Sequence, residues 1–99
     1  MIRLSIVVDS VSLVLQTYDQ VKVYRSDSED GVYTEITDGS SRINIVPEKT
    51  IYEFEDELGT HLNWYKTSYY HSTTTAESAQ SAGRQGGTET EKIGYTFNN

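Results

Sequence analysis

Histidines, serines and carboxylates are the residue types that could support catalysis in this chain, because it contains no cysteine. Its two histidines, His61 and His71, are separated by a whole expected strand, and neither belongs to a recognisable nucleophile motif. No Gly-x-Ser-x-Gly elbow occurs among the serines. The stretch from Gly83 to Gly87 is rich in glycine but lacks the spacing of a phosphate-binding loop. We therefore expect neither catalytic residues nor enzymatic activity.

Two acidic clusters have spacings that could bind a cation. Asp27, Glu29 and Asp30 lie in one expected turn, where carboxylates at alternating positions can bind calcium. That turn lacks the later bidentate glutamate and the flanking helices of a calcium-binding hand. On an expected strand, three carboxylates about 6–7 Å apart share one face: Glu53, Glu55 and Glu57. A solvated surface is the simpler interpretation of both clusters, so we expect no metal and no other cofactor.

The most aromatic stretch, residues 62–71, is a candidate binding surface. Two interpretations stay open at this point. Its rings either fill the core, or the outward set forms a platform that stacks on sugars or anchors a protein partner. Trp64 and Tyr70 are the candidate platform residues. We expect Tyr65 to face inward, together with the residues two and four positions after it.

Charge and hydropathy exclude several partner classes. Eight basic and fifteen acidic side chains give a formal net charge of −7 and a pI near 4.6. Contacts with nucleic-acid phosphates or an anionic membrane surface need the opposite sign. No segment approaches the roughly 20 apolar residues that span a bilayer. The apolar run near the start stops at Asp9, too early for a signal peptide. Neither nucleic acid nor membrane is an expected partner.

Apolar residues alternate with period two along most of the chain, which predicts strands rather than helices. The expected strands cover residues 2–8, 11–16, 21–25, 32–37, 43–45, 52–55 and 62–71. Polar, glycine-marked turns separate several of them. The short strands and regular turns predict an all-β fold, an antiparallel β-sandwich of about seven strands. We expect this sandwich to occupy residues 1–75.

Residues 76–99 are expected to form a flexible C-terminal arm. Residues 72–90 contain no large apolar side chain, so burial cannot offset the entropy lost on ordering them. The first few could still pair as a last sandwich strand. Apolar alternation returns at Ile93, Tyr95 and Phe97, a strand-like tip expected to bind a partner. A tether of roughly 20 residues could reach about 60 Å. A disordered end without a partner is the alternative.

Two stretches of the chain have the motif order of a known sandwich domain. The first comprises residues 18–26, a glycine-marked turn and residues 33–36; the second comprises residues 52–59 and 64–70. They resemble the middle hairpin, the leucine-glycine corner and the aromatic sixth strand of fibronectin type III domains, which are immunoglobulin-like sandwiches. The resemblance covers roughly residues 10–80.

The resemblance implies two corner residues, and the chain departs from the family's pattern at other positions. It implies that Leu58 belongs to the corner and that Tyr65 bonds the backbone near it. Trp64 is the alternative corner residue, and that one-residue shift would reverse the faces of the strand. The family's usual tryptophan is missing from the second strand, where residues 13–15 are Leu, Val and Leu. No Arg-Gly-Asp tripeptide occurs, so integrin binding does not carry over.

A lone domain of this kind resembles small accessory proteins of tailed bacteriophage particles, in which such sandwiches decorate the capsid, neck or tail. The resemblance implies a non-enzymatic virion component, assembled in the host cytoplasm as a capsid decoration, head–tail connector or tail subunit. Its partners would be capsid, portal or tail proteins and further copies of itself in a ring. The arm would add a strand to a partner's sheet. A carbohydrate-binding or cell-surface adhesion module is the alternative.

Overall fold

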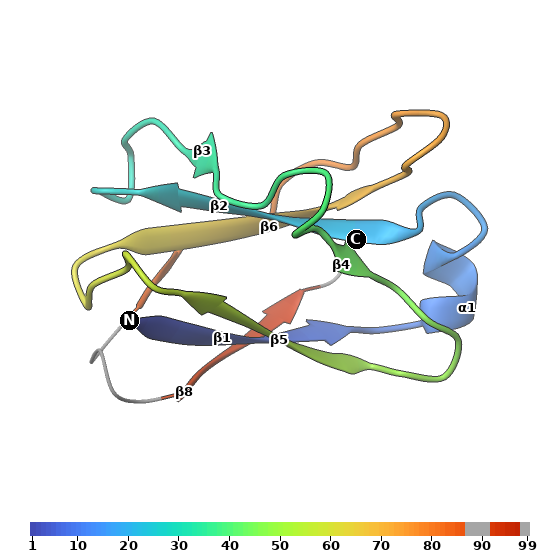
Figure 1. The fold of residues 1–99 in the computed structure, drawn as a ribbon, viewed down its shortest axis with the longest axis horizontal. Coiled ribbons are helices and arrows are strands. Elements are labelled where there is room, and N and C mark those ends of the chain that lie inside the picture. Colours follow the sequence, from blue (N-terminus) through green and yellow to red (C-terminus); the bar gives the residue numbers. More distant parts are fainter. Residues whose placement is uncertain (87–91, 98–99) are drawn as a thin grey trace.

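Strict alternation of apolar residues builds the centre of the smaller sheet. In β1 (Ile2–Val8), every second side chain is fully buried, and the residues between them are half-buried. β5 (Ile51–Asp56) pairs antiparallel with one edge of β1, and β8 (Lys92–Phe97) pairs parallel with the other (Figure 1). The computed structural model describes residues 1–86 and 92–97.

The larger sheet has two long central strands and short edges. β2 (Gln20–Ser26) and β6 (Trp64–Tyr70) pair antiparallel along their whole length. The edge strands are two residues long each: β3 (Thr34–Glu35), β4 (Ile43–Asn44) and β7 (Arg84–Gln85). β3 and β4 pair with β2, and β7 pairs with β6, all antiparallel. The seven strands β1–β7 confirm the predicted all-β antiparallel sandwich. The arrangement is compatible with an immunoglobulin-like or fibronectin type III-like domain.

The core lies between the two sheets. β1, β2, β5 and β6 each supply inward-facing apolar side chains to one cluster. Tyr65 and Tyr69 of β6 are almost fully buried, and Tyr69 stacks on Tyr18 with ring centroids 5.9 Å apart. Each fully buried large side chain of this kind stabilises the fold by roughly 1.5–3 kcal/mol. Tyr65 therefore faces inward with Thr67 and Tyr69, which confirms the predicted face of this strand.

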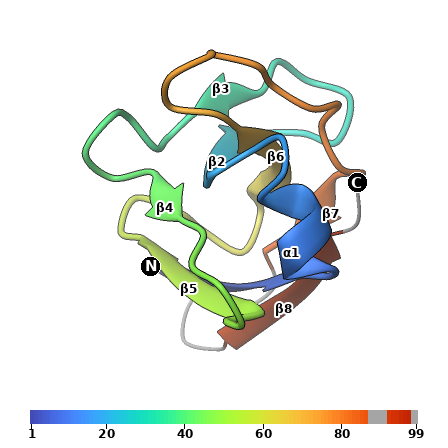
Figure 2. The ribbon, with the colours of Figure 1, turned by 90° about the vertical axis from the view of Figure 1, so that its right-hand side faces the viewer.

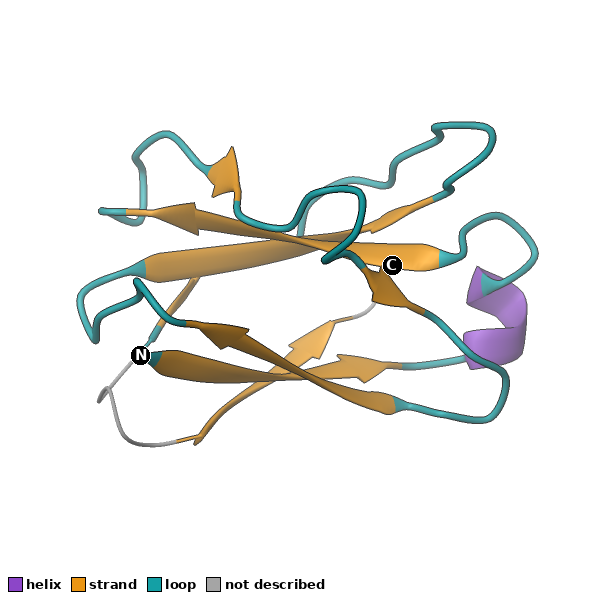
Figure 3. Cartoon of the chain, viewed as in Figure 1, coloured by secondary structure: helices purple, strands orange, loops and turns teal. Residues whose placement is uncertain are grey.

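The strand expected at residues 11–16 is wrong. The chain turns at Ser10, whose φ of 54° is left-handed, and continues as α1 (Val11–Val14). Val11 and Val14, three residues apart, are buried on one side of this helical turn, whereas the side chain of Leu13 is 61% exposed. A short apolar run fits both periods, so alternation alone could not decide between strand and helix. α1 lies at one end of the sandwich (Figure 3).

The sandwich continues past the expected boundary at residue 75. Residues 76–86 run antiparallel to β6, with main-chain hydrogen bonds from Ser78 N to Tyr69 O (2.9 Å) and Ser81 N to Thr67 O (2.8 Å). β7 is the regular end of this segment. The mobility expected of residues 76–99 remains a prediction. Seen from the end, β7 and β8 lie on the same side of the molecule but in different sheets (Figure 2).

Candidate partner-binding surfaces

The expected tip of the arm forms the strand β8. Its register pairs Ile93 with Leu4 and Tyr95 with Ile6, and Phe97 pairs with Val8. The strand-like character expected of this tip is present in the structure. The side chains of Ile93, Tyr95 and Phe97 lie outside the described side chains, so their binding to a partner remains a prediction. The acceptor of β8 in this structure is β1 of the same chain.

The outward face of β6 carries the two platform candidates. Trp64 and Tyr70 are both half-buried, and they lie at opposite ends of the strand. Six residue steps along the strand place them about 20 Å apart, too far for one sugar ring to stack on both. Two cations lie over the ring of Tyr70, Lys22 Nζ at 4.0 Å and Arg42 Cζ at 4.6 Å from its centroid. The two rings therefore do not form a common platform.

Leu58, the expected corner residue, is 81% exposed, so it is not a core residue. It lies in the loop after β5, together with Leu62, which is also exposed. Val32 is exposed in the loop between β2 and β3, at the same end of the sandwich (Figure 1). Asn63 joins these two loops, because its side-chain amide donates to Ser26 O at 3.4 Å and to Asp27 Oδ1 at 3.2 Å.

Beneath this end, Tyr65 ties β6 to the opposite sheet. Its hydroxyl donates to Asp56 Oδ2 at 2.7 Å, two residues before Leu58. Asp56 is almost fully buried, and its carboxylate also accepts Arg25 Nη1 at 2.7 and 2.9 Å. A buried carboxylate needs such partners to compensate for lost hydration. The three side chains thus join β2, β5 and β6 at one end of the core.

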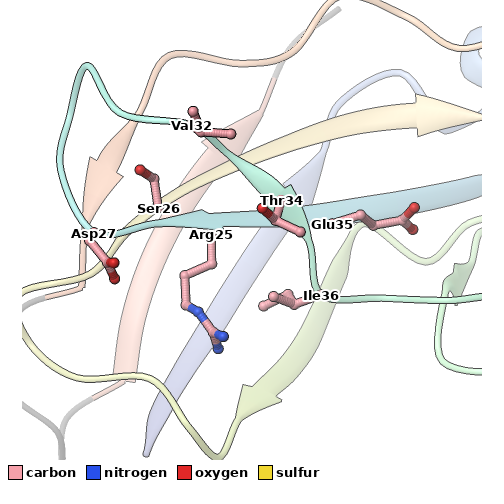
Figure 4. A pocket seen from close by; sticks show the side chains of 7 residues that line it. All are labelled: Arg25, Ser26, Asp27, Val32, Thr34, Glu35 and Ile36. Atoms are coloured by element: carbon pink, nitrogen blue, oxygen red, sulfur yellow. The ribbon is translucent and has the colours of Figure 1, made fainter.

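A pocket of about 340 Å³ opens beside Arg25 (Figure 4). β2, β3 and the loop between them supply its lining: Arg25, Ser26, Asp27, Val32, Thr34, Glu35 and Ile36. Val32 and Ile36 give it an apolar wall, and Arg25 and Asp27 bring charges of opposite sign. Its size is at the lower end for ligand pockets. The charged groups already have protein partners: Arg25 binds Asp56, Asp27 accepts from Asn63, and Glu35 accepts from Arg42.

On the outer face of the larger sheet, the carboxylate of Glu77 accepts hydrogen bonds from three side chains of β2 and β6. Lys22 Nζ donates to Oε1 at 3.2 Å, Ser68 Oγ donates to Oε2 at 2.8 Å, and Tyr24 donates a short hydrogen bond to Oε2. Burial alone would raise the pKa of Glu77, but these hydrogen bonds hold it below its usual value. Burial and the bond to Glu77 raise the pKa of Tyr24 to about 12. Glu77 therefore fastens residues 76–78 to the sheet.

Glu35 of β3 continues this outer-face network. Its carboxylate accepts Arg42 Nε at 2.9 Å and Thr37 Oγ1 at 2.8 Å, and Lys22 Nζ lies 3.7 Å away. Burial would raise the pKa of Glu35, but the hydrogen bonds from Arg42 and Thr37 lower it. Glu35 and Glu77 thus each bind several side chains and anchor the edge segments to the sheet.

The predicted cation clusters lie on exposed surfaces. Asp27, Glu29 and Asp30 are exposed in the loop after β2, and Glu53, Glu55 and Glu57 are exposed on β5 and just after it. Arg3 Nη2 pairs with Glu55 Oε1 at 2.8 Å. Within residues 1–86 and 92–97, no group of three or more His, Asp or Glu side chains is placed to hold a metal ion.

The histidines lie apart. His61 is exposed in the loop before β6, whereas His71 Nδ1 accepts the backbone N–H groups of Thr73 and Thr74 at 3.1 and 3.2 Å. His71 therefore shapes the turn after β6. No helix in the described part of the chain is long and apolar enough to cross a membrane.

Sequence reasoning missed the residues that bind the edge segments to the sheets. Glu77 was part of the expected arm, and Arg25 and Asp56 were assigned no partner. Arg25 and Asp56 are 31 positions apart, and Lys22 and Glu77 are 55 positions apart, separations that local patterns do not report. One available signal was the charge of Arg25 at an inward position of β2, because a partly buried cation that faces the core requires an anion beside it.

Comparison with known proteins adds no relative to this description. No family model, no curated protein and no solved structure matches the chain.

Proposed function

We propose that this protein is a non-enzymatic assembly subunit, a component of tailed-bacteriophage particles that attaches to a partner through β8. The proposal draws on the fibronectin type III-like order of motifs and on the location expected for such sandwiches in capsids, necks and tails. Partners are other virion proteins and further copies of the chain. The observation that carries the proposal is β8 itself, a strand beyond the seven that make the sandwich.

β8 has the properties of an added strand. It lies at the edge of the smaller sheet, where it pairs with β1. Strand addition gives affinity through main-chain hydrogen bonds and specificity through alternate side chains. A chain that presents such a strand to a neighbour joins an assembly without needing a catalytic cleft. Repetition of one weak strand contact around a symmetric assembly multiplies its effect through high local concentration.

The carbohydrate-binding alternative has less support from the same surface. Its two candidate aromatics lie at opposite ends of β6, and Lys22 and Arg42 already cover the ring of Tyr70. Sugar-binding platforms use exposed rings that are free to stack. No specific observation in the described residues favours this function over assembly.

Quantitative mass spectrometry of purified particles tests the proposal. Particles assembled with the full chain should contain it at a fixed copy number. A chain ending at residue 91, which lacks β8, should be lost from the particles while the sandwich still folds. The matched control is Glu57→Gln, an exposed change remote from β8, which should leave the copy number unchanged.

Two results would contradict the proposal. Absence of the full chain from any particle would remove the virion role. Retention of the chain ending at residue 91 at full copy number would show that attachment does not use β8. Circular dichroism of the truncated chain, compared with that of the full chain, separates loss of the arm from loss of the fold.

A further inference from the structure

We propose that copies of this chain exchange β8, so that Lys92–Phe97 of one copy pairs with β1 of another. The acceptor is the β1 edge opposite β5. The register is the parallel one recorded within the chain, from Arg3 with Lys92 to Val8 with Phe97. This inference rests on the proposed assembly function and names the partner of β8 as a second copy of this chain.

β1 needs a strand on this edge. Without β8, an uninterrupted seven-residue strand would present unpaired N–H and C=O groups, the usual cause of edge-to-edge association. The other edges in the described part of the chain are blunted. β3, β4 and β7 are two residues long, and β5 carries the exposed charges of Glu53 and Glu55. The β1 edge is therefore the surface that a donated strand fits.

The connection to β8 starts from a fixed point at Gly86. Its N–H donates to Asn63 O at 2.8 Å. The space around it is filled, because a Cβ there would lie 3.2 Å from Thr60 O and 3.3 Å from Tyr65 Cε2. Residues 76–86 are thus bound along β6, and the connection from the sandwich to β8 begins at Gly86.

Five residues separate Gly86 from Lys92. Six residue steps span about 20 Å when extended, and the two sheets of a sandwich are about 10 Å apart. The chain can therefore reach its own β1 or a β1 edge placed beside it. The molecule measures 35 × 25 × 23 Å, so the acceptor must be a copy in direct lateral contact.

β8 forms the same strand contacts whether it pairs with β1 of its own chain or with β1 of a second copy. Exchange then depends on concentration, because own-chain and partner pairing differ mainly in the entropy of association and in the connection. The β1–β8 pair is parallel, a type slightly less stable per residue than an antiparallel pair. When copies are held side by side in an assembly, effective concentrations in the millimolar range favour exchange.

Engineered disulfides test the exchange directly, because the chain has no cysteine of its own. Ser5 and Gly94 are register partners, and neighbouring strands bring such positions within reach of a disulfide. Equal amounts of a tagged Ser5→Cys chain and an untagged Gly94→Cys chain are mixed, incubated and oxidised. We expect a covalent heterodimer on a non-reducing gel. The chain carrying both changes should give covalent dimers and larger species.

Two further cysteine pairs and the single variants make the result decisive. Val7→Cys with Thr96→Cys is a second register pair, which covers the case that Gly94→Cys weakens β8. Ser5→Cys with Thr96→Cys is out of register by two residues and should cross-link less. Each single variant alone reports homodimers that form without strand pairing.

Cross-linking of the double variants only within single chains would overturn the exchange, and so would failure of both register pairs to cross-link. The particle measurement separates this inference from the proposed function. Chains retained on particles through β8 but cross-linked only internally would leave the assembly role and refute the exchange. Intermolecular cross-links in chains that are absent from particles would support the exchange and refute the virion role.

Discussion

At the residue scale, Gly59 shows how closely one end of the core is packed. Its position holds no side chain, and a Cβ there would overlap Tyr65 Oη and lie 2.6 Å from Asp56 Oδ2. Gly59→Ala must therefore displace a buried, hydrogen-bonded pair. We expect the free energy of unfolding in urea to fall by about 2–4 kcal/mol. Gly39→Ala is the matched control, because no atom lies within 4 Å of its Cβ position, and it should change stability by less than about 0.5 kcal/mol.

The carboxylate of Glu77 gives a pH-dependent prediction at the same scale. Its pKa is lower in the folded chain than in the unfolded chain, because the hydrogen bonds from Tyr24, Ser68 and Lys22 outweigh burial. Its contribution is therefore present above the usual glutamate pKa and is lost as pH falls through the folded value. Glu77→Gln should lower the free energy of unfolding at pH 7 by about 1–2 kcal/mol.

Unfolding curves at a series of pH values check this prediction. Glu77→Gln should also flatten the loss of stability below about pH 4.5, the range of an unperturbed glutamate. Glu57→Gln, at an exposed position, should follow the parent curve. A Glu77→Gln chain with the parent's acid sensitivity would show that Glu77 is not a source of that sensitivity.

At the element scale, residues 76–86 are bound to β6 by serine hydroxyls as well as by backbone. Ser78 Oγ accepts the N–H of Tyr69 at 2.9 Å, and Ser81 Oγ accepts the N–H of Thr67 at 3.0 Å. Ser78→Ala with Ser81→Ala leaves two amides of a central strand without acceptors. We expect hydrogen exchange at these amides to accelerate by about tenfold or more, since each lost acceptor costs roughly 1–3 kcal/mol. Ser40→Ala, in an exposed loop, should leave both rates unchanged.

These elements also show what the sequence could predict. β1, β5 and β6 alternate over six or seven residues, so their existence and inward faces were predictable. α1 was not, because its apolar run suits a strand equally well. The strand-like course of residues 76–86 was also hidden, because serines and Glu77 fasten it rather than alternating apolar side chains. The partners Arg25 and Asp56 are 31 residues apart, and only the packing of the two sheets brings them together.

At the scale of the whole molecule, β8 determines whether the β1 edge of the smaller sheet is paired. A chain ending at Gly86 keeps the seven antiparallel strands but leaves the β1 edge bare. We expect it to retain β-type circular dichroism and to associate with increasing concentration in sedimentation velocity, as exposed edge strands do. The net charge of −7 in the full chain opposes non-specific association, so the growth should be specific to that edge.

A lysine on β1 separates edge pairing from other causes of association. Ser5→Lys in the chain ending at Gly86 places a charge on the outward face of β1, beside the bare edge, and charged edges resist strand addition. The matched control, Glu57→Lys, makes an even larger change in net charge but lies outside β1. Suppression of association by Ser5→Lys and not by Glu57→Lys assigns it to the β1 edge. Equal suppression by both would assign it to net charge, and a chain ending at Gly86 that stays monomeric would show that β1 needs no eighth strand.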